Sequence, residues 1–323
     1  MFYYQPIHTS EGFILSIDKV IIDYRLNDIG AVTALGQLLD TLPIRFAVAT
    51  KRWESHKIGS FRENISVSFQ NHDSFWLGAM LNSTRIEYNR VRLEFNPNKC
   101  ALHDSFLSVL AFLNLHSRPM HTAIKRFDLA LDLAVERENV RLIKDSRVYS
   151  SRKHGKEWTE YLGAQASHIG RTKLYNKQAE AKLPMPLTRL EVTLDPATPF
   201  DKLPWPHAYY VQSQHVSMAK TVITDTERYI LSALLAGHGS TKDLCRKTRE
   251  KMEHLLSQYV QYITISNADY DLVKAHLLAF LAYPDNGLGL DRLDPDQPPT
   301  PHSLLPAWVS EAAHLPTELF FHS

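Results

Sequence analysis

Several features are scarce in this sequence, and each absence narrows the class of protein. Its two cysteines, Cys100 and Cys245, lie far apart, which indicates buried or incidental thiols in a reducing compartment. The sixteen histidines form no His-x-His or His-x-x-x-His pair, and Cys-x-x-Cys is absent, so the strong zinc signatures are missing. None of the twelve glycines belongs to a phosphate-binding loop, which argues against an NTPase or a dinucleotide enzyme. Gly-x-Ser-x-Gly is also absent, which removes one class of hydrolase.

An excess of charge of either sign is missing too. The formal net charge is +1, so any affinity for nucleic acid must come from local basic clusters. No apolar run approaches the ~18 residues that a membrane helix needs, and residues 1–11 show no signal-peptide pattern. The sequence therefore predicts a cytoplasmic protein with no membrane partner.

The periodicity of apolar residues predicts an α+β fold. Alternating or β-branched runs predict strands at 13–26, 44–49, 65–69, 75–81, 86–95, 123–135, 158–163, around Tyr175 and at 187–194. Helices are predicted at 29–42, ending near Pro43, and at 102–115. We expect a mixed, mostly antiparallel sheet with helices on one face and a functional site on the other, followed by a helical C-terminal region.

Three segments are expected along the chain. Residues 1–197 would form one domain, because the strand pattern ends where prolines and polar residues fill 195–206. Residues 198–283 would be a helical region, with helices at 225–236, 241–260 and 268–281. The tight turn before 241–260 and the cations of that helix are compatible with a helix-turn-helix, although two-helix hairpins more often only pack. Residues 284–323 would be a Pro-rich extension.

The stretch 171–180 carries the most informative pattern. With a period of two, Arg171, Lys173, Tyr175 and Lys177 share one face of a strand. Nearby cations would lower the pKa of the Tyr175 phenol and would also hold a phosphate. A half-buried strand tyrosine between solvated lysines is the plain alternative.

Carboxylates occupy the polar faces of three other predicted strands. Glu94 follows Arg92, Asp128 lies in the strand 123–135, and Glu191 follows Arg189. Hard oxygen ligands of this kind suit Mg²⁺ or Mn²⁺, although an ordinary solvent-exposed face would show the same pattern.

These groups together have the composition that cleavage of a phosphodiester by tyrosine requires. Tyr175 would be the nucleophile, and Lys173 and Lys177 would hold the phosphate. Glu94, Asp128 and Glu191 would bind the divalent cation, and basic groups such as Arg171 would place the strand. Attack would leave a phosphotyrosyl link on one DNA end and a free hydroxyl on the other.

The sequence resembles the single-tyrosine rolling-circle replication initiators, the Rep-trans or "replication initiation factor" family of plasmids, phages and integrative elements. The resemblance covers about residues 13–195 and is carried by Leu93-Glu94-Phe95-Asn96, Arg126-Phe127-Asp128, Glu160-Tyr161-Leu162-Gly163, Ser167, Lys173-Leu174-Tyr175-Asn176-Lys177 and Arg189-Leu190-Glu191-Val192. It implies an initiator that nicks one strand at an origin, stays on the 5′ end and leaves a 3′-OH for rolling-circle replication.

The resemblance also assigns roles. The nucleophile maps to Tyr175 and the metal ligands map to Glu94, Asp128 and Glu191, while Tyr161 and Ser167 would place DNA. We further expect DNA contacts from Arg171, Arg92 and Arg189. The implied partners are origin DNA and a host helicase and polymerase, and a homodimer stays open.

Three other functions remain compatible with the sequence. A conjugative relaxase or element-excision nickase would use the same chemistry. A non-catalytic, sequence-specific DNA-binding regulator would tolerate Tyr175→Phe. A nuclease that uses water would release a 5′-phosphate without protein-linked DNA.

Overall fold

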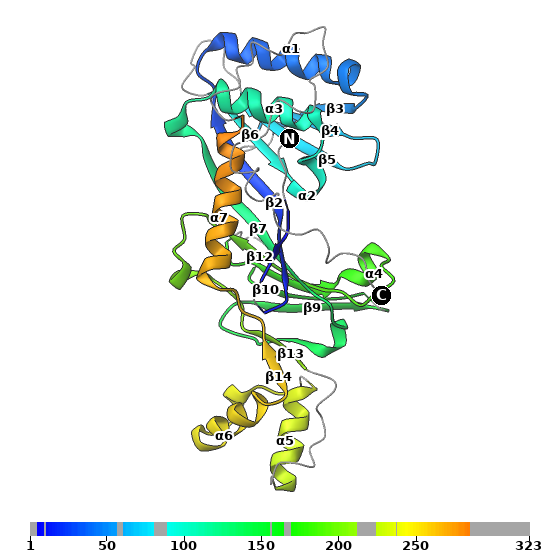
Figure 1. Cartoon of the computed structure of the whole chain (residues 1–323), viewed down its shortest axis with the longest axis vertical. Helices are drawn as coiled ribbons and strands as arrows, with labels where there is room; N and C mark the ends of the chain where they lie inside the picture. The colour runs from blue at the N-terminus through cyan, green and yellow to red at the C-terminus, as the bar shows by residue number, and fades with distance from the viewer. Residues whose placement is uncertain are drawn as a thin grey trace, which may run out of the picture. The chain divides into compact units, whose positions relative to one another are not determined.

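The computed structural model describes residues 5–9, 11–56, 61–80, 89–155, 157–164, 169–211, 224–236 and 238–284. These residues form a mixed α+β fold whose described strand pairs are antiparallel, which confirms the predicted fold class (Figure 1). Ser167 and nearly all of the segment 284–323 lie outside the described residues.

The strands are β1 (Ile7–His8), β2 (Ile14–Arg25), β3 (Ala49–Glu54), β4 (Glu63–Ser68), β5 (Ser74–Met80), β6 (Arg90–Phe95), β7 (Ala123–Leu133), β8 (Val140–Leu142), β9 (Tyr149–His154), β10 (Glu157–Leu162), β11 (Thr172–Asn176), β12 (Thr188–Leu194), β13 (Ala208–Val211) and β14 (Val260–Tyr262). The α-helices are α1 (Ile29–Phe46), α2 (Pro97–Cys100), α3 (Asp104–Leu115), α4 (Lys177–Ala181), α5 (Asp225–Leu235), α6 (Arg246–Leu256) and α7 (Asn267–Ala282). None of the helices in the described ranges is long and apolar enough to cross a membrane.

The chain divides into two compact units. The first lies within Met1–Gln5, Ile17–Lys125 and Val273–Ser323, and the second lies within Pro6–Ser16 and Arg126–Leu272. This division runs through the range 1–197 that the sequence predicts as one catalytic domain, so the predicted domain boundaries stay a prediction.

The first unit is an antiparallel sheet with helices on one face. Its strand order is β3-β4-β5-β6-β2. Along β6 the buried residues Val91, Leu93 and Phe95 alternate with Arg90, Arg92 and Glu94, as the sequence predicts. Helix α3 covers the apolar face, where its Phe106 lies 5.5 Å from Phe75 and 4.6 Å from Phe95 between ring centroids, and α1 packs on α3 (Figure 1).

Helix α1 is longer than the sequence predicts, so the predicted strand at 44–49 is wrong. The helix continues through Pro43 to Phe46 and ends where Ala47 adopts a left-handed conformation with φ of 52°. Proline removes one backbone donor, but the buried Leu39 and Leu42 continue the apolar stripe for another turn. Strand β3 therefore begins only after that turn.

The second unit contains the strand order β7-β12-β11-β10-β9 and a small sheet ordered β14-β13-β8. In the group β7-β12-β11-β10-β9, apolar residues of β7 and β12 such as Leu131 and Leu190 lie opposite each other on one face and are fully buried. Helices α5 and α6 pack with β13 and β14 around a separate apolar cluster that includes Leu231, Met252 and Tyr209.

Strand β9 is the element that the sequence analysis missed with most consequence. Its residues Ser150 to His154 are all exposed, so it shows no apolar alternation. It forms because its backbone pairs with β10 along six residues, from Tyr149 opposite Leu162 to His154 opposite Glu157. An edge strand of this kind is stabilised by its partner and not by burial.

Candidate functional site

The outer face of the second unit's sheet brings together the residues around Tyr175. In the β11–β12 register Lys173 lies opposite Glu191 and Tyr175 lies opposite Arg189, and residues directly opposite each other share a face. In the β12–β7 register Arg189 lies opposite Asp132. The alternation of β11 buries Thr172 and Leu174 on the other face.

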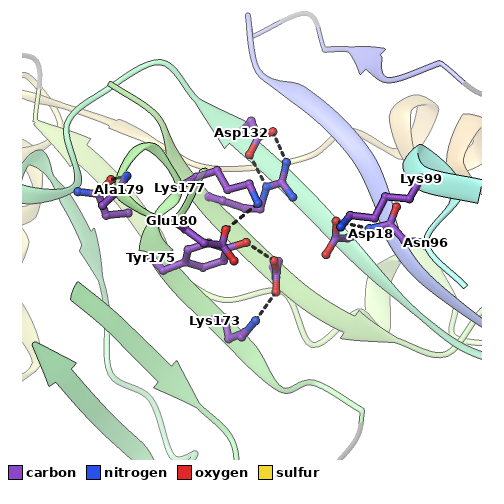
Figure 2. Close-up of polar contacts among 12 residues, drawn as sticks. Asp18, Asn96, Lys99, Asp132, Lys173, Tyr175, Lys177, Ala179 and Glu180 are labelled. Carbon is purple, nitrogen blue, oxygen red and sulfur yellow. Dashed lines mark hydrogen bonds and ion pairs between the residues drawn. The ribbon is translucent and has the colours of Figure 1, made fainter. Parts of the chain in front are cut away.

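Tyr175, Glu191 and Lys173 form a hydrogen-bonded triad, the Tyr175 triad. The Tyr175 hydroxyl donates to Glu191 Oε1 at 2.5 Å, and Lys173 Nζ donates to Glu191 Oε2 at 2.9 Å (Figure 2). Tyr175 is 7% exposed and Glu191 is 7% exposed, whereas the Lys173 side chain is 41% exposed. The carboxylate therefore bridges a buried phenol and a cation that solvent reaches.

The predicted lowering of the Tyr175 pKa is wrong for this arrangement. Burial raises the pKa of the Tyr175 phenol well above its ordinary value, and the charge and hydrogen bond of Glu191 raise it further. Burial opposes the charge on Lys173, but the carboxylate of Glu191 outweighs burial and raises the pKa of Lys173. The resting state is a neutral phenol beside an ion pair.

Lys177 lies close to Tyr175 but not on its strand face. It is the first residue of α4, where it forms an ion pair with Glu180 at 2.6 Å. Asn176 ends the strand because its side-chain Oδ1 accepts from the Ala179 backbone N–H at 2.9 Å and caps the helix. Lys177 Nζ still lies 5.9 Å from the centroid of the Tyr175 ring, and Lys173 Nζ lies at 5.2 Å, so two ammonium groups flank the ring.

Two arginines predicted to contact DNA are bound to carboxylates. Arg189 donates from Nε and Nη2 to the two oxygens of Asp132 at 2.6 and 2.7 Å. In the first unit, Arg92 donates to Asp23 in the same bidentate way at 2.6 and 2.8 Å. Burial opposes ionisation of Asp23, but Arg92 and Arg90 outweigh it and lower the pKa of Asp23. Bidentate pairs of this kind organise the sheet faces, and a role of Arg189 and Arg92 toward DNA stays a prediction.

Two further residues predicted to contact DNA lie near the Tyr175 triad. Arg171 immediately precedes β11, and Tyr161 lies on β10. Tyr161 is opposite Lys173, and the Arg171 guanidinium lies 5.6 Å from the Tyr161 ring centroid. Arg171 Nε has no hydrogen-bond partner among the described residues. Both side chains are half-buried and so reach solvent. Ser167, which the sequence groups with them, lies outside the described residues.

The three predicted metal ligands occupy different surroundings. Glu94, in the first unit, pairs with Lys19. In the second unit, Asp128 accepts from Thr193 Oγ1 at 2.6 Å, and Glu191 is part of the Tyr175 triad. Among the described residues no three His, Cys, Asp or Glu side chains form a group that could hold a metal ion. The metal site stays a prediction.

A second triad of similar chemistry, the Tyr149 triad, lies on the opposite face of the same sheet. The Tyr149 hydroxyl donates to Glu160 Oε1 at 2.6 Å, and Arg137 forms a buried ion pair with Glu160. The Arg137 guanidinium also lies 4.0 Å from the Trp158 ring centroid. The sequence analysis did not predict this triad. A signal was available, because Glu160 is an acid whose neighbours on the same strand face, Trp158 and Leu162, are apolar.

The cations of the predicted helix-turn-helix are largely engaged within the protein. Arg249 donates to the backbone carbonyls of Thr241, Lys242 and Leu244, and Arg246 pairs with Glu250 at 2.9 Å. Lys251 pairs with Glu227 of α5 at 2.5 Å. These contacts hold α6 against α5 and against the segment 241–244. DNA recognition by α6 stays a prediction.

Comparison with known proteins adds no family assignment. No protein-family model matches the chain, and no curated protein matches its sequence. The resemblance to rolling-circle initiators therefore rests on the motifs themselves.

Proposed function

We propose that this protein is a tyrosine nickase that cleaves one DNA strand at an origin and initiates rolling-circle replication. Tyr175 is the nucleophile, Glu191 is the group that accepts its proton, and Lys173 and Lys177 stabilise the phosphate. The observation that carries the proposal is the 2.5 Å hydrogen bond from the Tyr175 hydroxyl to Glu191, because a nucleophile and a base within this distance are the signature of an activated hydroxyl.

The reaction exchanges one ester bond for another and moves two protons. As Tyr175 Oη attacks the phosphorus, its proton passes to Glu191, and the bond from phosphorus to the 3′ oxygen breaks. The 3′ oxygen takes a proton from solvent and becomes a free hydroxyl, while the 5′ phosphate stays on Tyr175. The high pKa of Tyr175 keeps the phenol neutral at rest, so the nucleophile forms only as a substrate arrives.

The free 3′-OH determines the partners of this activity. A polymerase extends a 3′-OH, and a helicase must displace the strand that remains attached to the protein. We therefore include a host polymerase and helicase in the proposal. A conjugative relaxase would use the same chemistry, and the DNA site that is cleaved distinguishes the two.

A divalent cation is compatible with the donor groups on this face. Mg²⁺ needs only one or two carboxylates when phosphate oxygens and waters complete its shell. Asp128 presents a carboxylate on the same face as Glu191, opposite Thr193, which lies two residues further along β12, and it would hold Mg²⁺ or Mn²⁺ from this unit. Such an ion would neutralise charge on the phosphate oxygens.

Covalent capture tests the proposal. Purified protein is incubated with Mn²⁺ and supercoiled DNA carrying the origin, denatured in SDS and examined for protein-linked DNA. We expect the adduct with the natural protein and with Tyr149→Phe, which removes the hydroxyl of the matched Tyr149 triad. Tyr175→Phe should abolish the adduct while DNA binding is retained, since only the nucleophilic oxygen is lost.

Two outcomes would overturn the proposal in different directions. Relaxed DNA without an adduct would indicate a nuclease that uses water. Binding of origin DNA with neither product would indicate a DNA-binding regulator.

A further inference from the structure

The β9–β10 hairpin projects past the strand that carries Tyr175. Strand β11 pairs with Thr159 to Leu162 of β10, whereas the hairpin continues through the pairs Lys153–Trp158 and His154–Glu157. Gly155 makes the tight turn with φ of 57°, a conformation in which other residues are strained. The tip is therefore a two-stranded ribbon with no third strand from β11 beside it.

This ribbon is basic on both faces. Arg152, Lys153 and His154 are all exposed, and successive residues of a strand point to opposite sides. Arg152 makes no ion pair in the described part of the chain, and Lys153 lies over the Trp158 ring at 5.0 Å. Glu157 is the one acid in the sequence from Arg152 to Trp158.

The base of the ribbon is held firmly. The Trp158 indole donates to Ser151 Oγ at 3.0 Å, which ties the two strands together by their side chains. On the same ring, the buried Arg137 stacks at 4.0 Å. A fixed base keeps the exposed cations in a defined position, so little conformational entropy is lost when they bind an anion.

Duplex DNA is the partner that this shape and charge fit. The major groove admits a two-stranded β-ribbon, and cations on both faces of the ribbon would meet the phosphates of both groove walls. A second copy of the chain is a poor fit, since pairing β9 with itself would set its cations against one another.

We propose that the β9–β10 hairpin binds duplex DNA beside the cleavage site and presents the adjoining strand to Tyr175. Arg152, Thr159 and Tyr175 lie in one cross-strand row, so Arg152 is two strands away from the nucleophile, about 10 Å at the usual strand spacing. The inference rests on the proposed function for the DNA substrate and for the place of cleavage, whereas duplex binding by the hairpin can be measured without cleavage.

The test measures how DNA affinity depends on salt. The double variant Arg152→Gln/Lys153→Gln is made in the Tyr175→Phe background, and binding of a labelled duplex and of a single strand of the same sequence is followed by fluorescence anisotropy at several salt concentrations. Each lost phosphate contact lowers the slope of log K against log salt by about 0.9, so the duplex slope should fall by about 2 and affinity at low salt by about 10-fold or more.

The matched control removes two cations from α6. Arg246→Gln/Lys247→Gln should leave the duplex slope unchanged if the hairpin supplies the contacts. An unchanged slope in the hairpin variant would overturn the inference, and so would an equal loss for single-stranded DNA, which would indicate contacts to a backbone and not to a groove.

The two proposals fail separately. If natural protein forms no covalent adduct but the hairpin variant loses duplex affinity, then the nickase proposal fails and only the duplex binding by the hairpin stands. If the adduct forms and the hairpin variant binds duplex normally, the nickase stands without the hairpin.

Discussion

The second unit contains the Tyr175 triad and the Tyr149 triad on opposite faces of one sheet, and the two differ in how far solvent reaches the cation. Each consists of a tyrosine that donates to a glutamate that also binds a cation. In the Tyr149 triad the cation is Arg137, which is 1% exposed and stacked on Trp158. In the Tyr175 triad it is Lys173, whose side chain is 41% exposed. A phenol, a carboxylate and a cation thus meet on each face. By the exposure of its cation the Tyr149 triad is closed and the Tyr175 triad is open, although the Tyr149 phenol is half-buried and the Tyr175 phenol is buried.

Under the proposed function, access of solvent to the cation, and not the kinds of group present, distinguishes the Tyr175 triad from the Tyr149 triad. Arg137 has a planar guanidinium that also donates to the Val140 carbonyl, so the cation of the Tyr149 triad is held by a second acceptor besides Glu160. Lys173 is a flexible ammonium at the surface, and it can turn toward a phosphate without leaving the site. The predictions below test this contrast.

The largest expected effect comes from the two glutamates. Glu191→Gln keeps the shape of the Tyr175 triad but removes the proton acceptor, so adduct formation should fall by about 10²- to 10⁴-fold, the usual contribution of a general base. Glu160→Gln should leave the rate of adduct formation on folded protein unchanged. Quench-flow or timed SDS quenching measures both rates, and equal losses in the two variants would refute the contrast.

The two cations should differ in stability. Arg137→Ala leaves Glu160 buried without its charge partner, which should cost about 3–5 kcal/mol of unfolding free energy. Lys173→Ala also leaves a buried carboxylate, Glu191, without its ion pair, but water can reach the position that the 41% exposed lysine vacates, so the cost should be smaller, about 1–2 kcal/mol. Denaturant titration gives both values, and the assignment of a closed and an open triad would be wrong if Lys173→Ala were the more destabilising.

The smallest expected effect is a dependence of stability on alkaline pH. Burial, together with the Glu160 hydrogen bond and charge, raises the pKa of Tyr149 to about 12 from an ordinary value of 10.0. A raised folded-state pKa means that this contribution is fully present below pH 10.0 and is lost as pH rises through about 12. Unfolding free energies measured from pH 9 to 12 should therefore fall less steeply for Tyr149→Phe than for the natural protein. Parallel curves would show that Tyr149 is not perturbed.

Much of the fold follows from alternation in the sequence, and the missing parts have physical causes. Strand β6 is predictable because Val91, Leu93 and Phe95 alternate with polar residues. Strand β9 has no such pattern, and it forms because its backbone pairs with the backbone of β10. The strand that carries Tyr175 is predicted at the right place, but Tyr175 is buried although it lies on the polar face.

The partners of the site residues are harder to predict. A sequence shows that Arg189 and Asp132 each lie on a polar strand face, but only the register places them opposite each other. The pKa of Tyr175 shows the same limit, because three nearby cations in the sequence suggest a lowered value. The acceptor that decides the direction, Glu191, lies sixteen residues further along the chain.

The most direct test of the account is to identify the residue that carries DNA. A trapped adduct is digested with trypsin and nuclease, and the nucleotide-linked peptide is sequenced by mass spectrometry. The account predicts the modification on the peptide Leu174–Lys177, which contains Tyr175, and none on Val148–Arg152, which contains Tyr149. Nucleotide on any peptide other than Leu174–Lys177 would contradict it.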